Sequence, residues 1–375
     1  MIAALFWICA GLIVFTHAGY PLTLWVLARL RRRPTLEHPG TVEELPAVSL
    51  IVAAFDEEAG IAAKVRNALE LEYPRERLQV IVASDGSADR TVEAARAAGA
   101  DLVLDLPRAG KLVAQNAAVG QATGAILAFS DANAFWRPDA LLRLIEPFAD
   151  PAVGYVCGQL RLTGAYGDNL EGVYWRYEMA VRALESGLGG VTAGNGGIYA
   201  VRAAAYLPLP PEASHDLSLP FELAKRDLRS LFAPAAVADE RMVPTLEGEF
   251  ARKRRMMIGL WDIVVREGMV SPRGYPALFA FQIASHRLLR YLTPLLHVVA
   301  LGANVALLGD GWVYTATLAL QLALIAAALL GRYLPLAPLR MARYYVLTTA
   351  SIAAGLWDRM RRGRPGTWEK AEGTR

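Results

Sequence analysis

The chain has 375 residues, a net charge of +3 and 54% hydrophobic residues. This hydrophobicity, combined with 20% charged residues, is typical of a soluble domain joined to membrane segments. The near-neutral charge and the lack of a nucleic-acid-binding motif argue against a nucleic-acid partner, and two cysteines are too few for a disulfide framework or a zinc cluster.

The first element is an apolar run from Ile2 to Leu30, long enough to cross a hydrocarbon core of about 30 Å. Its C-terminal end carries a cluster of arginines: Arg29, Arg31, Arg32 and Arg33. The positive-inside rule places the chain beyond them in the cytoplasm. We therefore predict that residues 1–33 are an N-terminal transmembrane anchor that is not cleaved. The alternative, a buried soluble helix, fits the length and the basic flank less well.

Residues 45–265 show the pattern of a soluble α/β domain. Apolar runs predict strands at 48–54, 79–83, 101–104 and 125–129, and Ala-rich stretches between them predict helices at 59–70, 89–98, 111–122 and 138–147. Such alternation is typical of βαβ units and of a mostly parallel sheet.

The C-terminal third turns apolar again and predicts a return to the membrane. We expect an interfacial helix over 266–287 and a transmembrane hairpin over 288–331. Residues 332–375 are predicted to form an interfacial or re-entrant helix and a basic cytoplasmic tail, because Arg340 and Arg343 would each cost about 2.5–3.5 kcal/mol at a membrane centre. A third full C-terminal crossing is the alternative.

Two of the predicted strands end in an aspartate, Asp85 and Asp131. Ligands of open α/β sheets bind beyond the carboxyl ends of the strands, so both are candidate ligand contacts. Asp85 could accept a hydrogen bond from a base imide or a ribose hydroxyl, and a helix cap is the alternative for this turn. Asp131 and Asn133 lie two residues apart and face the same way in extended chain. Their oxygens suit Mg²⁺ or Mn²⁺.

Weaker signals lie at two predicted helix starts. Small residues and then acids follow the first strand, and acids are favourable at a helix N-terminus. Lys111 follows Gly110 at another helix start, where a positive charge opposes the helix dipole. An anionic ligand such as a phosphate would offset this, and a solvated lysine is the alternative.

Six segments, in this order, closely resemble membrane-anchored family 2 glycosyltransferases of the GT-A fold, the group of the cellulose, chitin and hyaluronan synthases. They are Ala-Ala-Phe-Asp-Glu-Glu, Ser-Asp-Gly-Ser-Ala-Asp-Arg-Thr, Gly-Lys-Leu-Val-Ala-Gln-Asn-Ala, Ser-Asp-Ala-Asn, Gly-Asn-Gly-Gly-Ile-Tyr-Ala-Val-Arg and His-Asp-Leu-Ser-Leu-Pro-Phe. The resemblance covers roughly residues 45–265. It implies a Rossmann-like α/β domain with a mostly parallel sheet, flanked by transmembrane and interfacial helices.

The resemblance also implies roles for individual residues. Asp131 and Asn133 occupy the Asp-x-Asp position that holds the metal and the diphosphate, with Asn133 in place of the second acid. Asp216 matches the acid that serves as catalytic base, and the adjacent His215 is the alternative base. The donor contacts that we expect are Ala54, Asp56, Glu58, Asp85, Lys111, Asn116, Asp131, Gly196, Arg252 and Arg255.

One departure from the pattern bears on chain length. The segment Arg252-Lys253-Arg254-Arg255-Met256 stands where processive members have Gln-x-x-Arg-Trp. Arg255 can still bind a diphosphate with two hydrogen bonds. Met256 replaces the tryptophan that would stack on an acceptor sugar, which puts long-chain processive synthesis in doubt.

Together these features predict an inverting hexosyltransferase that requires Mg²⁺ or Mn²⁺. It would move a sugar from a nucleotide-diphosphate sugar, expected to be a UDP-sugar, to a lipid-linked saccharide or an exopolysaccharide. The predicted place is the inner (plasma) membrane, with the catalytic domain in the cytoplasm. Two alternatives stay open: a processive polysaccharide synthase that also secretes its polymer, and an inactive nucleotide-binding subunit of a polysaccharide assembly or export complex.

Overall fold

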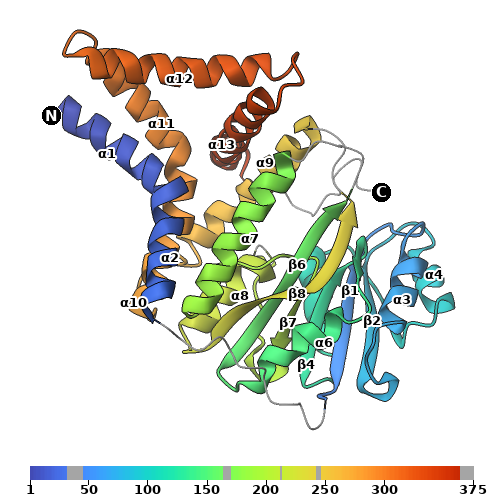
Figure 1. Ribbon diagram of the computed structural model, residues 1–375. Coiled ribbons are helices and arrows are strands. Elements are labelled where there is room, and N and C mark those ends of the chain that lie inside the picture. Colours follow the sequence, from blue (N-terminus) through green and yellow to red (C-terminus); the bar gives the residue numbers. More distant parts are fainter. Residues whose placement is uncertain (32–44, 164–169, 212, 242–245, 364–375) are drawn as a thin grey trace.

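The computed structural model shows an α/β domain beside a group of long helices from both ends of the chain (Figure 1). It describes residues 1–31, 45–163, 170–211, 213–241 and 246–363. The predictions for Arg32, Arg33 and the tail from residue 364 onward concern residues outside this description.

An eight-stranded sheet forms the centre of the α/β domain, in the order β3-β2-β1-β4-β7-β6-β8-β5. The strands are β1 Val48–Ala54, β2 Leu78–Asp85, β3 Leu102–Leu106, β4 Ile126–Asp131, β5 Ala134–Trp136, β6 Val153–Thr163, β7 Tyr199–Arg202 and β8 Arg229–Arg241. The first four strands in this order pair in parallel, as predicted. β7 is antiparallel to both of its neighbours, so the sheet is mixed beyond β4.

Helices cover both faces of this sheet, and every residue of β1 is buried, as expected for a parallel strand covered on both sides. The helices of the domain are α3 Ile61–Leu69, α4 Thr91–Ala97, α5 Lys111–Val119, α6 Ala140–Ile145, α7 Leu170–Leu188, α8 His215–Ala224 and α9 Leu246–Val265, with short 3₁₀ turns at Arg75–Arg77, Glu146–Ala149 and Ala203–Ala205. The four helices predicted in this region are present and shorter than predicted. Gly60, for example, is the N-cap of α3, which therefore starts at Ile61 and not at residue 59. The helix α5 starts at Lys111 as predicted but ends early, at Val119.

The N-terminal helix runs through α1 Ile2–Val14, a π-helical turn at Phe15–Gly19 and α2 Tyr20–Arg31. It lies beside a second long helix made of α10 Ala277–Gln282, a π-helical turn at Ile283–Leu288 and α11 Leu289–Ala306 (Figure 1). The predicted division at residue 287 is therefore not a helix end, because the helix continues from the π-helical turn into α11, which also accommodates Pro294. The interfacial placement of 266–287 stays a prediction.

Two more helices complete the group. α12 Trp312–Leu330 follows a turn at Gly309 and Gly311, both of which have positive φ. The transmembrane hairpin over 288–331 stays a prediction. α13 Ala337–Arg362 then runs back to α9 (Figure 1).

By length and composition, three helices of the described chain could cross a membrane: Ile2–Leu30, Ala277–Ala306 and Trp312–Leu330. α13 is not one of them. An interfacial or re-entrant α13 therefore remains our prediction.

Two reciprocal ion pairs connect α13 to α9. Arg254 donates to both carboxylate oxygens of Asp358, at 2.5 and 2.7 Å. In the opposite direction, Arg359 donates to both oxygens of Asp262, at 2.9 and 3.0 Å. Paired hydrogen bonds of this kind fix orientation as well as distance, so α13 is held against the last helix of the α/β domain.

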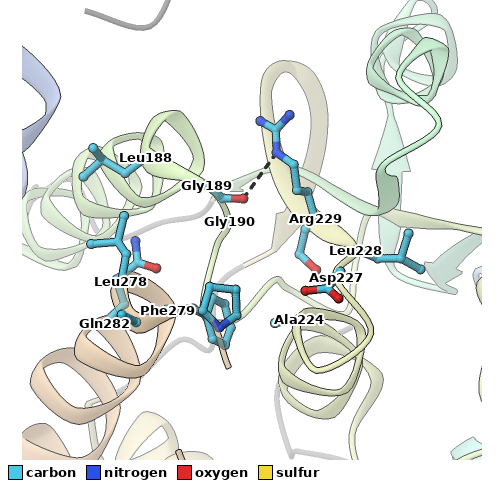
Figure 2. Close-up of a pocket in the computed structure, with 13 residues that line it drawn as sticks. Leu188, Gly189, Gly190, Ala224, Asp227, Leu228, Arg229, Leu278, Phe279 and Gln282 are labelled. Carbon is cyan, nitrogen blue, oxygen red and sulfur yellow. Dashed lines mark hydrogen bonds between the residues drawn. The ribbon is translucent and has the colours of Figure 1, made fainter. Parts of the chain in front are cut away.

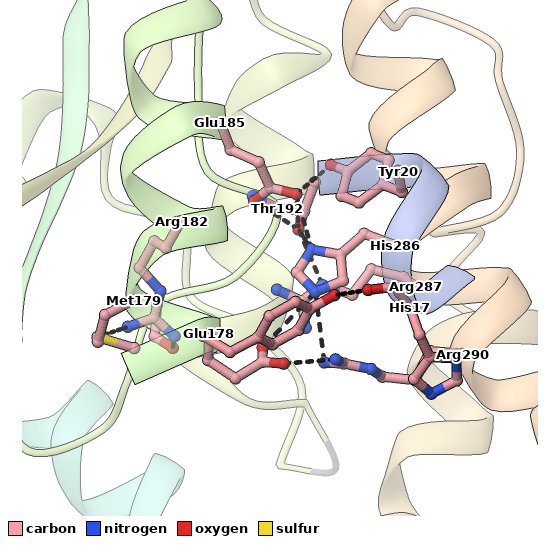
Figure 3. Close-up of polar contacts among 12 residues, drawn as sticks. His17, Tyr20, Glu178, Met179, Arg182, Glu185, Thr192, His286, Arg287 and Arg290 are labelled. Atoms are coloured by element: carbon pink, nitrogen blue, oxygen red, sulfur yellow. Dashed lines mark hydrogen bonds and ion pairs between the residues drawn. The ribbon is translucent and has the colours of Figure 1, made fainter. Parts of the chain in front are cut away.

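A buried polar cluster joins both long helices to α7 (Figure 3). Tyr20 donates to Glu185 Oε1 at 2.5 Å, and His286 Nδ1 lies 2.7 Å from the same oxygen. Glu185 Oε2 accepts from the backbone N–H of Thr192 at 3.1 Å. Burial alone would raise the pKa of Glu185, but His286 and Arg287 lower it to about 2, so this carboxylate is ionised within the junction.

Removing the central carboxylate should weaken this junction. We expect Glu185→Ala to destabilise the protein by about 3–5 kcal/mol, since it leaves buried partners without their counter-charge. Tyr20→Phe removes one hydrogen bond and should cost about 0.5–1.5 kcal/mol. Thermal unfolding of the detergent-purified chain would compare them with Glu146→Ala, which breaks an exposed pair with Arg143. Equal melting of Glu185→Ala and Glu146→Ala would contradict the assigned role of the cluster.

Candidate active site

The carboxyl ends of β1, β2 and β4 lie at one edge of the sheet. The strand register pairs Ala53 with Asp131 and Ala54 with Ser84, the residue before Asp85. The two strand-end aspartates therefore flank the end of β1, which is the crevice position expected for a ligand site.

Asp85 organises the loop that precedes α5. Its side chain is 2% exposed, and its Oδ1 accepts from the backbone N–H groups of Ala109, at 2.7 Å, and Gly110, at 2.9 Å. The Arg108 guanidinium lies 3.4 Å from Asp85 Oδ2 and stacks on the Phe55 ring. The stacked Arg108 guanidinium and Phe55 ring therefore form a flat, positively charged surface beside Asp85. Neither Arg108 nor Phe55 was among the predicted site residues.

Asp56 and Glu58 lie in the loop that follows β1, next to the turn after Asp85. Asp56 Oδ1 accepts from the Ala88 N–H at 2.8 Å, and Glu58 Oε2 accepts from the Arg90 N–H at 3.1 Å. Their own backbone N–H groups donate to Ser87 and Asp89 in return. These bonds tie the loop after β1 to the turn after β2.

Asp131 forms an ion pair with Lys111 at the end of β4. A Cβ atom built on Gly196 would lie 3.5 Å from Asp131 Oδ2 and from Lys111 Nζ, so the three predicted residues meet at one point. Burial alone would lower the pKa of Lys111, but Asp131, with weaker help from Asp216 and Glu240, raises it. Lys111 is thus a fixed positive charge surrounded by carboxylates.

Glu240 lies in this group and was not among the predicted site residues. It projects from β8, and its Oε1 accepts from Asn133 Nδ2 at 3.1 Å. Burial first, and then the charge of Asp131, raise the pKa of Glu240 to about 7. Arg252 of α9 acts in the opposite direction, which indicates that this predicted donor contact is near the site. Arg255 on the same helix is exposed.

A buried lysine supports the turn that carries Asn133. Lys64 of α3 is fully buried, and its Nζ donates to the Ala134 carbonyl at 2.5 Å. Burial, partly offset by Asp131, lowers the pKa of Lys64 to about 7. The buried stripe of α3 includes Ile61 and Val65, so Lys64 reaches the turn from the core face of its helix.

Asp216 lies in the first turn of α8, beside the Gly194–Gly196 loop. Its carbonyl accepts from the Gly194 N–H at 2.7 Å, and its carboxylate accepts from Ser214 Oγ. A Cβ atom on Gly194 would come within 1.9 Å of the Tyr155 hydroxyl, so only glycine fits this close approach. Asp216 is half-buried, and its charge acts on Lys111. Asp216 therefore belongs to the same group as Asp131.

His215 points away from this group, into a cluster of tyrosines. Its Nδ1 lies 2.7 Å from the Tyr199 hydroxyl and its Nε2 lies 3.0 Å from the Tyr206 hydroxyl. Burial and the charge of Lys111 lower its pKa to about 3. Asn116 belongs to the same cluster, because its Oδ1 accepts from Tyr206 at 2.5 Å and its Nδ2 donates to the Leu209 carbonyl. Both side chains are therefore held by contacts with protein groups within this cluster.

This arrangement gives an expected result for His215. We expect His215→Gln to lower sugar transfer less than tenfold and to leave the acidic limb of the pH–rate profile unchanged, because a group with a pKa of about 3 stays neutral throughout the working range. Initial rates between pH 5 and 9 would test this. A lost or shifted acidic limb would make His215, and not Asp216, the titrating base.

The donor set fits a hard divalent cation. Asp131, Asn133 and Glu240 offer carboxylate and amide oxygens, which Mg²⁺ and Mn²⁺ prefer. In the part of the chain that the structure describes, no three His, Cys, Asp or Glu side chains form a complete metal site. A cation here would need further ligands from a bound diphosphate, as is usual for Mg²⁺ sites.

A separate cavity of about 370 Å³ lies between the end of α7, the start of β8 and α10 (Figure 2). Its walls include Gly189, Arg229 and Phe279, and none of the predicted site residues. The cluster around Asp85, Asp131 and Asp216 is therefore the candidate active site.

Comparison with known proteins gives a consistent result. The Glycosyl transferase family 2 profile matches residues 49–200. The chain is 30% identical over 251 residues to a beta-monoglucosyldiacylglycerol synthase of Trichormus variabilis, a match that covers 60% of this chain and 53% of the relative. It is 29% identical over 233 residues to an N-acetylglucosaminyltransferase of Rhizobium meliloti, covering 56% and 54%. The chain thus spans about half the length of these relatives.

One solved structure resembles nearly the whole chain. It is the mannosyltransferase PcManGT from Pyrobaculum calidifontis in complex with GDP-Man and Mn²⁺. The TM-score is 0.74 at 25% sequence identity, over 95% of this chain and 99% of that one. The similarity therefore extends beyond the α/β domain to the flanking helices.

Proposed function

Residues 49–200 form a family 2 glycosyltransferase domain with the GT-A fold, and on this premise we propose that the protein transfers a sugar from a nucleoside diphosphate to an acceptor with inversion. The observation that carries this proposal is the meeting of Asp131, Lys111, Gly196 and Asp216 at the carboxyl ends of the parallel strands. Such a site holds charge for a leaving diphosphate and offers a base for the acceptor.

The residues of the site would have separate roles in this transfer reaction. Asp85 and the stacked pair of Arg108 and Phe55 would hold the nucleoside. Asp216 would take the proton from the acceptor hydroxyl as that oxygen attacks the anomeric carbon. Lys111 and Arg252 would place positive charge beside the diphosphate as the glycosidic bond to it breaks.

Asp131 and Asn133 would hold Mg²⁺ or Mn²⁺, which when bound neutralises charge on the leaving diphosphate. The Mn²⁺ in the PcManGT complex supports a divalent ion here. The same complex contains GDP-Man, so GDP-sugars join the expected UDP-sugars as candidate donors.

We propose a lipid or lipid-linked saccharide as the acceptor, at the cytoplasmic membrane face. Three helices that could cross a membrane support this placement. In addition, α7 contacts the N-terminal helix and also holds the Gly194 loop, since Arg182 of α7 donates to the Gly194 carbonyl at 2.9 Å. One relative is named for a glucosyldiacylglycerol product, which agrees with a lipid acceptor.

A transfer assay tests the whole proposal. The purified chain in detergent would be incubated with Mn²⁺, membrane lipid extract and a panel of radiolabelled UDP- and GDP-sugars. We expect label to enter the lipid fraction from one donor. Thermal stabilisation by UDP or GDP without any transfer would favour the inactive nucleotide-binding subunit, and transfer into a long polymer would favour the processive synthase.

A further inference from the structure

A side-chain carboxyl group from another strand lies beside the position at which this chain lacks the second acid of the Asp-x-Asp pattern. Asn133 stands at the second position of the pattern, and its Nδ2 donates to Glu240 Oε1 at 3.1 Å. The register of the sheet brings the two together, because Ala134 on β5 pairs with Glu240 on β8. A carboxylate is therefore present beside the position that has lost one.

The hydrogen bond also fixes which end of the amide faces the site. An ionised carboxylate has acceptor atoms only, so the atom of Asn133 that faces the ionised form of Glu240 is the amide nitrogen. The amide oxygen is consequently the atom turned away from Glu240. Without such a partner, an asparagine could present either its nitrogen or its oxygen.

We propose that Glu240 is a positioning residue that orients Asn133 with its Oδ1 toward the divalent cation and, in its ionised form, supplies the negative charge missing at residue 133. This inference rests on the proposed function, since it concerns the same metal and diphosphate site. Two neighbouring glycines place the backbone close to both acids. A Cβ atom on Gly197 would lie 3.6 Å from Glu240 Oε2, and one on Gly196 would lie 3.5 Å from Asp131 Oδ2.

Exchanging the acid and the amide between residues 133 and 240 tests the inference. Mn²⁺ binding to the full detergent-purified chain with UDP or GDP would be measured by the loss of the free-ion electron paramagnetic resonance signal. We expect Glu240→Gln to weaken Mn²⁺ binding by about 10–100-fold, the usual effect of removing a partner of a metal ligand. The double variant Asn133→Asp with Glu240→Gln keeps one acid and one amide in exchanged places, and should recover most of that loss.

The adjacent residue provides a matched control. Asp239 follows the alternation of the strand to the other face of the sheet, where it pairs with Arg161. Asp239→Asn should therefore bind Mn²⁺ as the wild type does. A Glu240→Gln variant with wild-type affinity, or a double variant no better than Glu240→Gln, would overturn the inference.

The same titration separates this inference from the proposed function. Asp131→Ala should lose Mn²⁺ binding under either outcome for Glu240. If the wild type itself binds no Mn²⁺ with either nucleotide, the metal-dependent function fails, and the inference fails with it. If Asp131→Ala loses binding while Glu240→Gln retains it, only the role of Glu240 is refuted.

Discussion

Replacing Asp216 with asparagine is expected to lower the rate of sugar transfer by about 10²–10⁴-fold, the usual contribution of a general base. The amide keeps the size of the side chain and can still accept from Ser214. It cannot take a proton from the acceptor hydroxyl. Donor affinity should be unchanged, because the nucleoside contacts that we propose lie at Asp85, at the end of a different strand. Initial transfer rates and nucleotide titration together measure both quantities.

The controls for Asp216 come from its neighbours in the chain. Ser214→Ala removes the hydroxyl that donates to the carboxylate and should cost far less than Asp216→Asn. His215→Gln changes the adjacent side chain, whose ring nitrogens are both bound to tyrosines. Undiminished transfer by Asp216→Asn would remove it as the base.

Removing the metal should have an effect of similar size. We expect EDTA treatment to reduce transfer by at least about 10²–10³-fold, because charge on the leaving diphosphate then loses its main stabilisation. Asp131→Ala should reproduce this loss and should also leave Lys111 without its ion-pair partner. Rates would be measured before chelation, after chelation and after Mn²⁺ or Mg²⁺ is added back.

Restoration by added metal distinguishes the two treatments. The chelated wild type should recover with Mn²⁺ or Mg²⁺, whereas Asp131→Ala should not. Full activity in EDTA would show that Lys111 and the arginines of α9 suffice, and the site would then be metal-independent.

The sequence predicted the parts of the site that follow a strand end. Asp85 and Asp131 terminate two buried parallel strands, and neighbouring parallel strands end at the same edge. The two aspartates therefore lie at the same edge of the sheet whatever number of residues separates them in the chain. The parallel half of the sheet was predictable for the same reason, because alternating strands and helices leave few other topologies.

Other parts depend on contacts that no local pattern encodes. Glu240 reaches Asn133 across a strand pair that joins residues 107 positions apart, and nothing near Glu240 indicates its partner. Lys64 lies on the core face of α3, where a helical pattern predicts an apolar residue. Asn116 lies in a segment that resembles the donor-binding segments of the family, but its side-chain amide forms hydrogen bonds with the Tyr206 hydroxyl and the Leu209 carbonyl. In each case tertiary packing decides the role.

The two reciprocal ion pairs between α9 and α13 limit the positions at which this protein can be truncated or recombined. A fragment that stopped after α9 would present Arg254 and Asp262 without Asp358 and Arg359. Chimeras that graft the membrane segments of a relative onto this α/β domain would need to carry α9 and α13 as a matched set. The boundary for recombination thus lies before α9, inside the segment that resembles the catalytic domain.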